Sequence, residues 1–256
     1  IATICLSGGM DSTSLLLHLI HENFVVYTLS FNYGQKHILE LEKASNNIKY
    51  LNNKGFDVFH KVLDISDTAS LLQSSLTDRN SNIPKGYYEE ENMKSTVVPN
   101  RNSIFLSFLY GYSLSLYKKH NKEITLSLGV HSGDHAIYPD CRLDFYNKIF
   151  EAFRIGNWDS ENLELHLPYI ELDKKGILQD AISICNEMKL NFNEIFKNTL
   201  TSYQPNSEGK SNGETGSDIE RILAFGELGI KDPIDYQDSW ENVLKRAQKI
   251  ESDYNK

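Results

Sequence analysis

Six consecutive residues near the start of the chain, Ser7 to Ser12, have the types and spacing of an anion-binding turn. They read Ser-Gly-Gly-Met-Asp-Ser, between an apolar run at 1–6 and a helical run. Two glycines allow a tight turn and a close backbone approach to an anion. Backbone N–H groups at a helix start attract negative charge. We therefore predict that Ser7, Gly8, Gly9 and Ser12 hold phosphate groups.

The same turn carries Asp11 and lacks the lysine of the Walker motif, G-x-x-x-x-G-K-[ST]. A carboxylate next to phosphates is repulsive unless a cation lies between them. Asp11 therefore predicts Mg²⁺ held between the carboxylate and phosphate oxygens. The alternative, a plain strand-to-helix turn in which Asp11 caps the helix, stays open.

A second concentration of reactive side chains is the loop at 131–142, which reads His-Ser-Gly-Asp-His-Ala-Ile-Tyr-Pro-Asp-Cys-Arg. Polar groups at this density after a strand are typical of a functional loop. A third candidate is Arg101, which we expect just before a helix at 104–116 that Asn102 or Ser103 caps. Its planar guanidinium matches a carboxylate or a phosphate, and a structural salt bridge is the alternative.

The elements that position these groups alternate between strands and helices. Apolar runs predict strands at 1–6, 25–31, 56–63, 124–130 and 163–169, and amphipathic periodicity predicts helices at 12–21, 37–53, 104–116, 143–153 and from 172. This alternation predicts an α/β fold, a Rossmann-like parallel sheet with right-handed crossovers. Ligands bind at the carboxyl ends of such strands, so the turn at 7–12 and the segment 31–35 should share one edge.

We divide the chain into a nucleotide-binding α/β domain at 1–180 and a small helical C-terminal subdomain at 181–256. The polar, irregular insertion at about 66–96 is typical of a lid, with plain disorder as the alternative. We expect a mobile loop at 202–217.

Composition sets limits on the partners. The net charge of −9 makes a phosphate-backbone surface for nucleic acid unexpected. Three scattered cysteines, Cys5, Cys141 and Cys185, are typical of free thiols in a reducing compartment. Neither a membrane span nor a signal peptide is expected, so we predict a cytoplasmic enzyme without nucleic-acid or membrane partners.

Several stretches together resemble the 7-cyano-7-deazaguanine synthase family. They are SGGMDST, FNYGQKH, VPNRN, GVHSGDHAIYPDCR, HLPYIELDKKGI, TLTSY and RILAFGELGIKDP, in the family's order along the chain. This family belongs to the PP-loop ATP pyrophosphatases, which have the adenine-nucleotide α-hydrolase-like fold. The resemblance implies a ligase that uses ATP and Mg²⁺ to adenylate the carboxylate of 7-carboxy-7-deazaguanine. Ammonia then displaces AMP to give an amide, and a second ATP converts the amide into a nitrile for queuosine synthesis.

The resemblance also implies roles for individual residues and a homodimeric assembly. We assign the nucleotide to Ser7, Gly8, Gly9, Asp11, Ser12, Leu29, Phe31 and Gln35, with plain core packing as the alternative for Leu29 and Phe31. We assign the deazaguanine to Arg101, Asn102, Gly129, Tyr138, Asp140 and Arg142. The catalytic candidates are Asp11, Arg101, Asp134 and His135.

Several further polar residues lie close in sequence to these candidates, and for each of them a structural role is a strong alternative. Lys36 and His37 could reach a phosphate, and a surface position at the helix start is the alternative. Cys141 is expected to be a packing residue, because acyl-adenylate chemistry needs no thiol nucleophile. His131 and His135 have a metal-like spacing but lack a third ligand nearby, so we expect no metal there.

One departure from the family is large. The family carries a four-cysteine zinc site, and the aligned positions here hold Ser202, Asn212, Thr215 and Asp218. Hydroxyls, an amide and one carboxylate do not form a tetrahedral zinc site. We therefore expect no zinc and a loosely packed loop, since a structural zinc contributes folding energy.

Three functions stay open at this point. The chain could be a nitrile synthase that lost its zinc. It could instead resemble the synthase-like proteins of antiviral defence, type IV CBASS among them, which join a deazaguanine to a protein amine such as an N-terminus or a lysine. The third alternative is a non-catalytic nucleotide- or base-binding module, against which the intact SGGMDS and YPDCR motifs argue.

Overall fold

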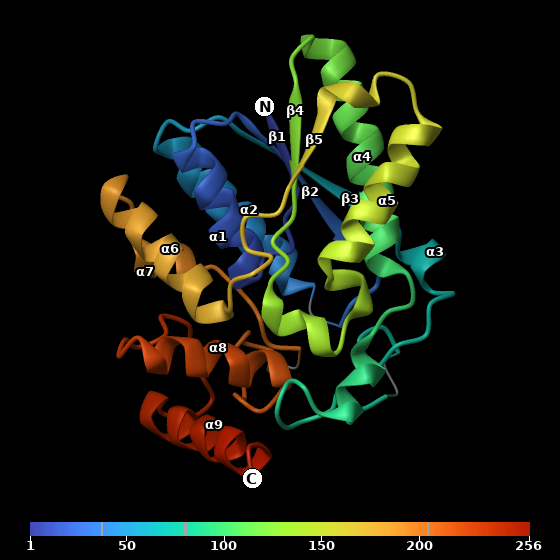
Figure 1. Ribbon diagram of the computed structural model, residues 1–256. Helices are drawn as coiled ribbons and strands as arrows, with labels where there is room; N and C mark the ends of the chain where they lie inside the picture. The colour runs from blue at the N-terminus through green and yellow to red at the C-terminus, as the bar shows by residue number, and fades with distance from the viewer. Residues whose placement is uncertain (37, 79–80, 204) are drawn as a thin grey trace.

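The computed structural model describes residues 1–36, 38–78, 81–203 and 205–256. At its centre lies a sheet of five parallel strands (Figure 1). Their spatial order is β3 (Val58–Asp64), β2 (Val26–Asn32), β1 (Ala2–Cys5), β4 (Ile124–Ser127) and β5 (Leu163–His166). The predicted α/β, Rossmann-like parallel sheet is therefore confirmed. The strand order reverses between β1 and β4, and ligands bind outside the carboxyl ends of the strands at such a point.

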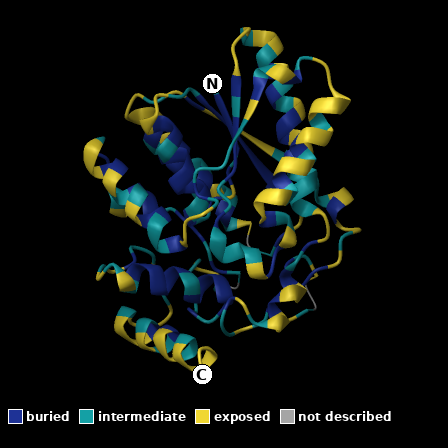
Figure 2. Cartoon of the chain, viewed as in Figure 1, coloured by how far each residue is buried: buried dark blue, intermediate teal, exposed yellow. Residues whose placement is uncertain are grey.

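Helices cover both faces of the sheet (Figure 1). One face carries α1 (Met10–His21), α2 (Leu39–Asn53), α6 (Lys174–Glu187) and α7 (Phe192–Lys197), and the other carries α4 (Arg101–His120) and α5 (Leu143–Gly156). Central strands are therefore buried on both sides, as Figure 2 shows, which explains why β2 is a nearly continuous run of buried residues. None of the helices in the described ranges is long and apolar enough to cross a membrane.

The insertion and the C-terminal helices lie together near the carboxyl ends of the strands (Figure 1). The insertion contains the short helices α3 (Ser66–Ala69) and η1 (Glu91–Thr96), and the C-terminal part contains α8 (Gly216–Glu227) and α9 (Trp240–Tyr254). Gly86 N–H donates to the backbone oxygen of Glu214 at 3.2 Å, and the rings of Tyr87 and Tyr254 stack with centroids 4.3 Å apart. The insertion is thus joined to the C-terminal helices by backbone and aromatic contacts.

Several element boundaries differ from expectation around the functional loops. The helix expected at 104–116 spans Arg101–His120, and its N-cap is Asn100, neither Asn102 nor Ser103. Arg101 is therefore the first helical residue. β4 ends at Ser127 and not at 130, because Leu128 to Val130 leave the sheet and line a cavity. A 3₁₀ turn, η4 (Ser160–Asn162), leads into β5, which ends at His166.

Candidate active site

The turn between β1 and α1 forms a compact group of N–H and hydroxyl donors. Gly8 has φ of +88°, and a Cβ there would lie 2.1 Å from the backbone oxygen of Glu40, so only glycine fits. Gly9 N–H donates to Ser7 Oγ at 3.2 Å, and this Oγ lies 3.0 Å from Ser12 Oγ. Gly9 is the N-cap of α1 and provides no side-chain hydrogen bond. The first helical turn can therefore present its N–H groups to an anion.

Asp11 lies in the first turn of α1 and faces two basic side chains. Its Oδ2 is 3.3 Å from Lys174 Nζ and 3.7 Å from His131 Nε2. Burial alone would raise the pKa of Asp11, but Lys174 and His131 outweigh it, so the pKa lies below its usual value. Its Oδ1 is buried without a hydrogen-bond partner in the part of the chain that the structure describes. A charged carboxylate with one free oxygen fits Mg²⁺ shared with phosphates.

Lys174 is a site residue that the sequence interpretation missed. It begins α6, whose N-cap Asp173 accepts a hydrogen bond from Gly176 N–H at 2.7 Å. Its side chain is only 6% exposed, and its Nζ also lies 2.8 Å from Glu220 Oε2 on α8. Burial opposes the charged form, but Asp11 and Glu220 keep the pKa of Lys174 above its usual value. The lysine within HLPYIELDKKGI, a stretch already matched to the family, was the signal for it.

A cavity of about 270 Å³ lies next to the anion-binding turn. It brings together many of the residues assigned from sequence, which are Ser7, Gly9, Asp11, Ser12, Leu29, Phe31, Arg101, Asn102, Gly129, Asp134 and Tyr138. These residues come from the carboxyl ends of β1, β2 and β4, from the starts of α1 (Met10–His21) and α4, and from the 3₁₀ segment that follows β4. The expectation that the anion-binding turn and the end of the second strand share one edge is confirmed.

Arg101 borders this cavity without a carboxylate partner. No ion pair joins its guanidinium to a carboxylate among residues 1–36, 38–78, 81–203 and 205–256. Its Cζ lies 6.0 Å from the centre of the Tyr33 ring, a cation–π distance. A half-buried cation that lacks a carboxylate partner among the described residues and faces a cavity is suited to an anionic ligand. The structural salt bridge considered from sequence is absent within those ranges.

Asp134 reaches the cavity from η2 (Ser132–Ala136) and is held by the insertion. Tyr88 O–H donates to Asp134 Oδ1 at 2.7 Å, and His131 Nε2 lies 3.5 Å from Asp134 Oδ2. Tyr138 is also fixed by the insertion, since its hydroxyl lies 2.6 Å from Thr96 Oγ1. The insertion therefore supplies side chains that orient two candidate residues, which its lack of periodicity did not indicate.

Cys141 ends η3 (Pro139–Cys141) and lies in the cavity wall. Its Sγ is 3.6 Å from Asn102 Nδ2. Burial raises the pKa of the Cys141 thiol well above its usual range, so the thiol stays protonated and weakly nucleophilic. This agrees with its interpretation as a packing residue.

Other predicted residues do not line this cavity, namely Gly8, Gln35, His135, Asp140 and Arg142. The buried Gln35 amide braces the turn after β2, because its Nε2 donates to Phe31 O at 3.0 Å and to Glu40 Oε1 at 2.9 Å. The exposed Arg142 guanidinium donates twice to the backbone oxygen of His135, at 3.0 and 2.9 Å. These contacts place Gln35 and Arg142 as supports of the loops around the cavity.

The remaining candidates near the cavity differ in their surroundings. His135 Nε2 and Asp140 Oδ1 are buried without hydrogen-bond partners in the described ranges. Burial raises the pKa of Asp140 above its usual value. Lys36 Nζ donates to the backbone oxygen of Ser81 at 2.6 Å, so it holds the insertion. His37 lies outside the described residues.

The positions aligned with the zinc cysteines form a buried polar cluster. The carboxylate of Asp218, 1% exposed, accepts from Ser202 Oγ at 3.1 Å, from Ser211 Oγ at 2.6 Å and from Thr215 Oγ1 at 2.6 Å. Asn212 instead accepts from the backbone of Glu214 and does not contact this carboxylate. The expectation of a loosely packed loop is wrong for these residues, because hydroxyl donors surround the carboxylate in the interior.

Comparisons with known proteins agree over nearly the whole chain. The family model for the queuosine biosynthesis protein QueC matches residues 1–229. The 7-cyano-7-deazaguanine synthase of Caldicellulosiruptor saccharolyticus is 41% identical, over 92% of this chain and 95% of that protein. The 7-cyano-7-deazaguanine synthase 1 of Colwellia psychrerythraea is 45% identical, over 90% of this chain and 96% of that protein.

Likeness to solved structures is weaker. The NMN synthetase from Francisella tularensis aligns with 97% of this chain and 85% of its own, at 14% identity and a TM-score of 0.39.

Proposed function

Since the chain belongs to the family of the queuosine biosynthesis protein QueC, we propose that it is an ATP-dependent synthase that converts 7-carboxy-7-deazaguanine into 7-cyano-7-deazaguanine. The family model and the relatives named 7-cyano-7-deazaguanine synthase support an enzyme of queuosine biosynthesis. The finer proposal is that it forms an acyl adenylate, with release of pyrophosphate and later of AMP.

The main support for this proposal is the lining of one cavity. A single cavity is bordered on one side by the N–H and hydroxyl groups of the Ser7–Ser12 turn and on another by the guanidinium of Arg101. The turn suits the phosphates of ATP, and Arg101 suits the carboxylate of a second substrate. Two anionic groups held in one cavity are what a carboxylate-activating enzyme needs, because proximity replaces a bimolecular collision.

The first step is an attack of the substrate carboxylate on the α-phosphorus of ATP. A carboxylate oxygen forms the new bond to phosphorus, and the bond to the β-phosphate oxygen breaks to release pyrophosphate. Ser7, Ser12 and the N-terminus of α1 would orient the phosphates, and Lys174 would add positive charge near them. Mg²⁺, when bound at Asp11, supplies further neutralisation of the phosphate charge.

The second step is an attack of ammonia on the acyl carbon of the adenylate. The bond between that carbon and the AMP oxygen breaks, and the nitrogen loses a proton as the amide forms. Asp134 is the carboxylate that we propose accepts this proton, because it borders the cavity and is oriented by Tyr88. A second adenylation, now at the amide oxygen, releases a second pyrophosphate. The bond between carbon and the AMP oxygen then breaks, and the nitrogen gives up both of its protons over these two steps, which leaves the nitrile.

The test is turnover by the purified chain with ATP, Mg²⁺, ammonium and 7-carboxy-7-deazaguanine. We expect AMP and pyrophosphate to be released only when the base is present, and mass spectrometry to detect the nitrile. The Asp11→Asn variant should lose AMP release, since the amide removes the charge that holds the cation. Absence of AMP release by the wild-type chain would contradict the adenylation proposal.

The product identifies which alternative holds if the nitrile is absent. An amide that accumulates would show that only the first half of the reaction occurs. A partner protein heavier by one acylated deazaguanine would show transfer to a protein amine, as in the antiviral alternative. Binding of ATP and base without any AMP would show a non-catalytic module.

A further inference from the structure

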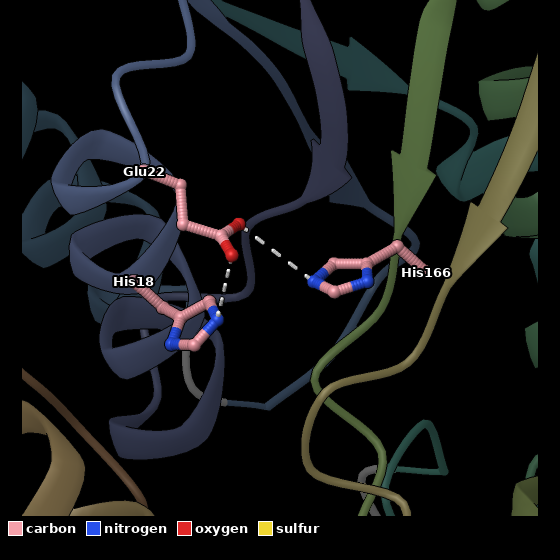
Figure 3. Close-up of side chains that lie close together, drawn as sticks. All are labelled: His18, Glu22 and His166. Atoms are coloured by element: carbon pink, nitrogen blue, oxygen red, sulfur yellow. Dashed lines mark ion pairs between the residues drawn. The ribbon is translucent and has the colours of Figure 1, made fainter.

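A cluster of two histidines and a glutamate lies at the far end of α1 from the anion-binding turn (Figure 3). His18 and Glu22 are four residues apart at the end of this helix, and His166 ends β5. The Glu22 carboxylate lies between the two imidazole rings, with its oxygens 3.7 Å from His18 Nε2 and 3.8 Å from His166 Nε2. Glu22 lies eleven positions after Asp11, about 16 Å along a helix, so the cluster is separate from the cavity.

The His18 ring is oriented by groups behind it. Its Nδ1 lies 2.9 Å from Asp180 Oδ2 on α6, and this same oxygen accepts a hydrogen bond from Tyr169 O–H at 2.7 Å. Because a carboxylate only accepts, Nδ1 must carry the proton and donate it. The Nε2 of a neutral His18 then presents its lone pair to Glu22. A carboxylate behind a histidine in this way is the usual support of a metal-binding imidazole.

The spacing of the three ligand atoms suits a cation better than hydrogen bonds. Distances of 3.7 and 3.8 Å are too long for hydrogen bonds between nitrogen and oxygen. His166 Nε2 is buried without a hydrogen-bond partner among the residues that can be described. In a tetrahedral zinc site with bonds of about 2.0–2.1 Å, ligand atoms lie about 3.3–3.4 Å apart. The ligand atoms of the three side chains all lie within 4.8 Å of one another, and each nitrogen-to-oxygen distance needs to shorten by only about 0.4 Å to reach that spacing.

We propose that His18, Glu22 and His166 bind a first-row divalent cation of the Zn²⁺ class, with Asp180 positioning His18. Two imidazoles and one carboxylate are ligands of borderline softness that favour such ions over Mg²⁺ or Ca²⁺. All three side chains are partly exposed, between 22% and 39%, so an ion can enter from solvent. The expectation of no zinc came from residues 202–218 alone and did not consider this end of α1.

The bound ion would have a structural role. It would join the end of α1 to the end of β5, and Asp180 would extend that connection to α6. These elements have no covalent link other than the chain itself. An ion that binds the folded state alone raises its stability by mass action.

The experiment is a titration of the full chain with Zn²⁺, after removal of bound metal, in competition with a chromophoric zinc indicator. We expect one Zn²⁺ per chain, and a loss of affinity of at least about tenfold in His18→Gln and in His166→Gln. Asp180→Asn should weaken binding by about tenfold or more, because it changes the partner of Nδ1. Zn²⁺ should also raise the melting temperature of the wild type and not that of His166→Gln.

The matched control is His21→Gln. His21 is on the same helix and lies 2.9 Å from Glu187, but among the described residues it belongs to no group of three metal-ligating side chains. This variant should bind Zn²⁺ like the wild type. Absence of binding at micromolar Zn²⁺ would overturn the proposal, and so would binding that His166→Gln leaves unchanged. Melting of each variant without metal checks that it folds.

Discussion

The ammonium of Lys174 lies 3.3 Å from the carboxylate of Asp11, although one begins α6 and the other lies in the first turn of α1. Glu220 on α8 holds the same ammonium at 2.8 Å. Three helices that are distant in sequence thus meet behind the anion-binding turn. A positive charge fixed at this position offsets Asp11 and leaves the turn attractive to phosphates.

Lys174→Met should destabilise the protein and weaken ATP binding. Methionine has a side chain of similar length but leaves the partly buried carboxylates of Asp11 and Glu220, 23% and 18% exposed, without the ammonium between them, which costs about 3 kcal/mol. Urea unfolding measures the stability, and ATP titration measures the affinity. Adding Glu220→Gln should recover much of the stability, because one unpaired charge is removed, while ATP binding stays weak. If the double variant bound ATP normally, Lys174 would have only a structural role.

Gly8→Ala should lower the stability of the folded protein by more than the cost of placing alanine at a positive φ. A Cβ at Gly8 would lie 2.1 Å from the backbone oxygen of Glu40, so the turn or α2 must move. Gly55 is the matched control, since its φ of +92° is similar and nothing lies within 4 Å of an added Cβ. Gly55→Ala should cost only the left-handed penalty of about 1–2 kcal/mol. Equal losses for the two variants, measured by thermal unfolding, would contradict the close approach.

Arg101→Gln should lower kcat/KM for the deazaguanine acid by about a hundredfold, or ~2.7 kcal/mol. Arg101→Lys should recover only part of this loss, because a point charge does not match the carboxylate with two hydrogen bonds. Arg142→Gln is the control, since the Arg142 guanidinium is exposed, does not line the cavity and donates its hydrogen bonds to the backbone oxygen of His135. Steady-state AMP release at varied base concentration measures all three. A larger loss in Arg142→Gln would reassign the carboxylate-binding role.

Deprotonation of Glu40 should lower the free energy of unfolding as the pH rises through neutrality. Burial raises the pKa of this carboxyl from 4.5 to about 7, and the Gln35 amide opposes the shift only in part. The folded state therefore holds the proton more tightly than the unfolded chain. This contribution is complete below pH 4.5 and is lost as the pH rises through about 7.

Between about pH 5.5 and 8.5 the loss is on the order of 2 kcal/mol. Glu40→Gln should remove this part of the pH dependence when unfolding by urea is measured across that range. Glu42→Gln is the control, since Glu42 lies in the same helical turn and is exposed. An unchanged profile in Glu40→Gln would contradict the shifted pKa.

Local patterns predicted the parts of the fold that depend on neighbouring residues. The Ser7–Ser12 turn was predictable because glycines and a helix start lie side by side in sequence. Asp173 was predictable at the start of its helix, and it is the N-cap, because capping depends on residues within one turn. The parallel pairing of the strands also followed from their alternation with helices, whereas the place of β4 next to β1 did not.

The partners of buried charges were not predictable in this way. Nothing near Lys174 in the sequence indicates Asp11 or Glu220, since their contact depends on how α6 and α8 pack. For the same reason Tyr88 could not be assigned to Asp134, although the insertion was expected near the site. Ser211 joined the Asp218 cluster in place of Asn212, because a shift of one residue in a loop reverses which side chain is buried.

The hydroxyl cluster around Asp218 has a consequence for the conditions under which this subdomain stays folded. Serine and threonine hydroxyls undergo neither the oxidation nor the disulfide exchange that thiolates undergo. The hydrogen bonds that Ser202, Ser211 and Thr215 donate to Asp218 therefore involve no group that an oxidant can convert into a disulfide. This polar cluster therefore keeps its hydrogen bonds whether its surroundings are oxidising or reducing.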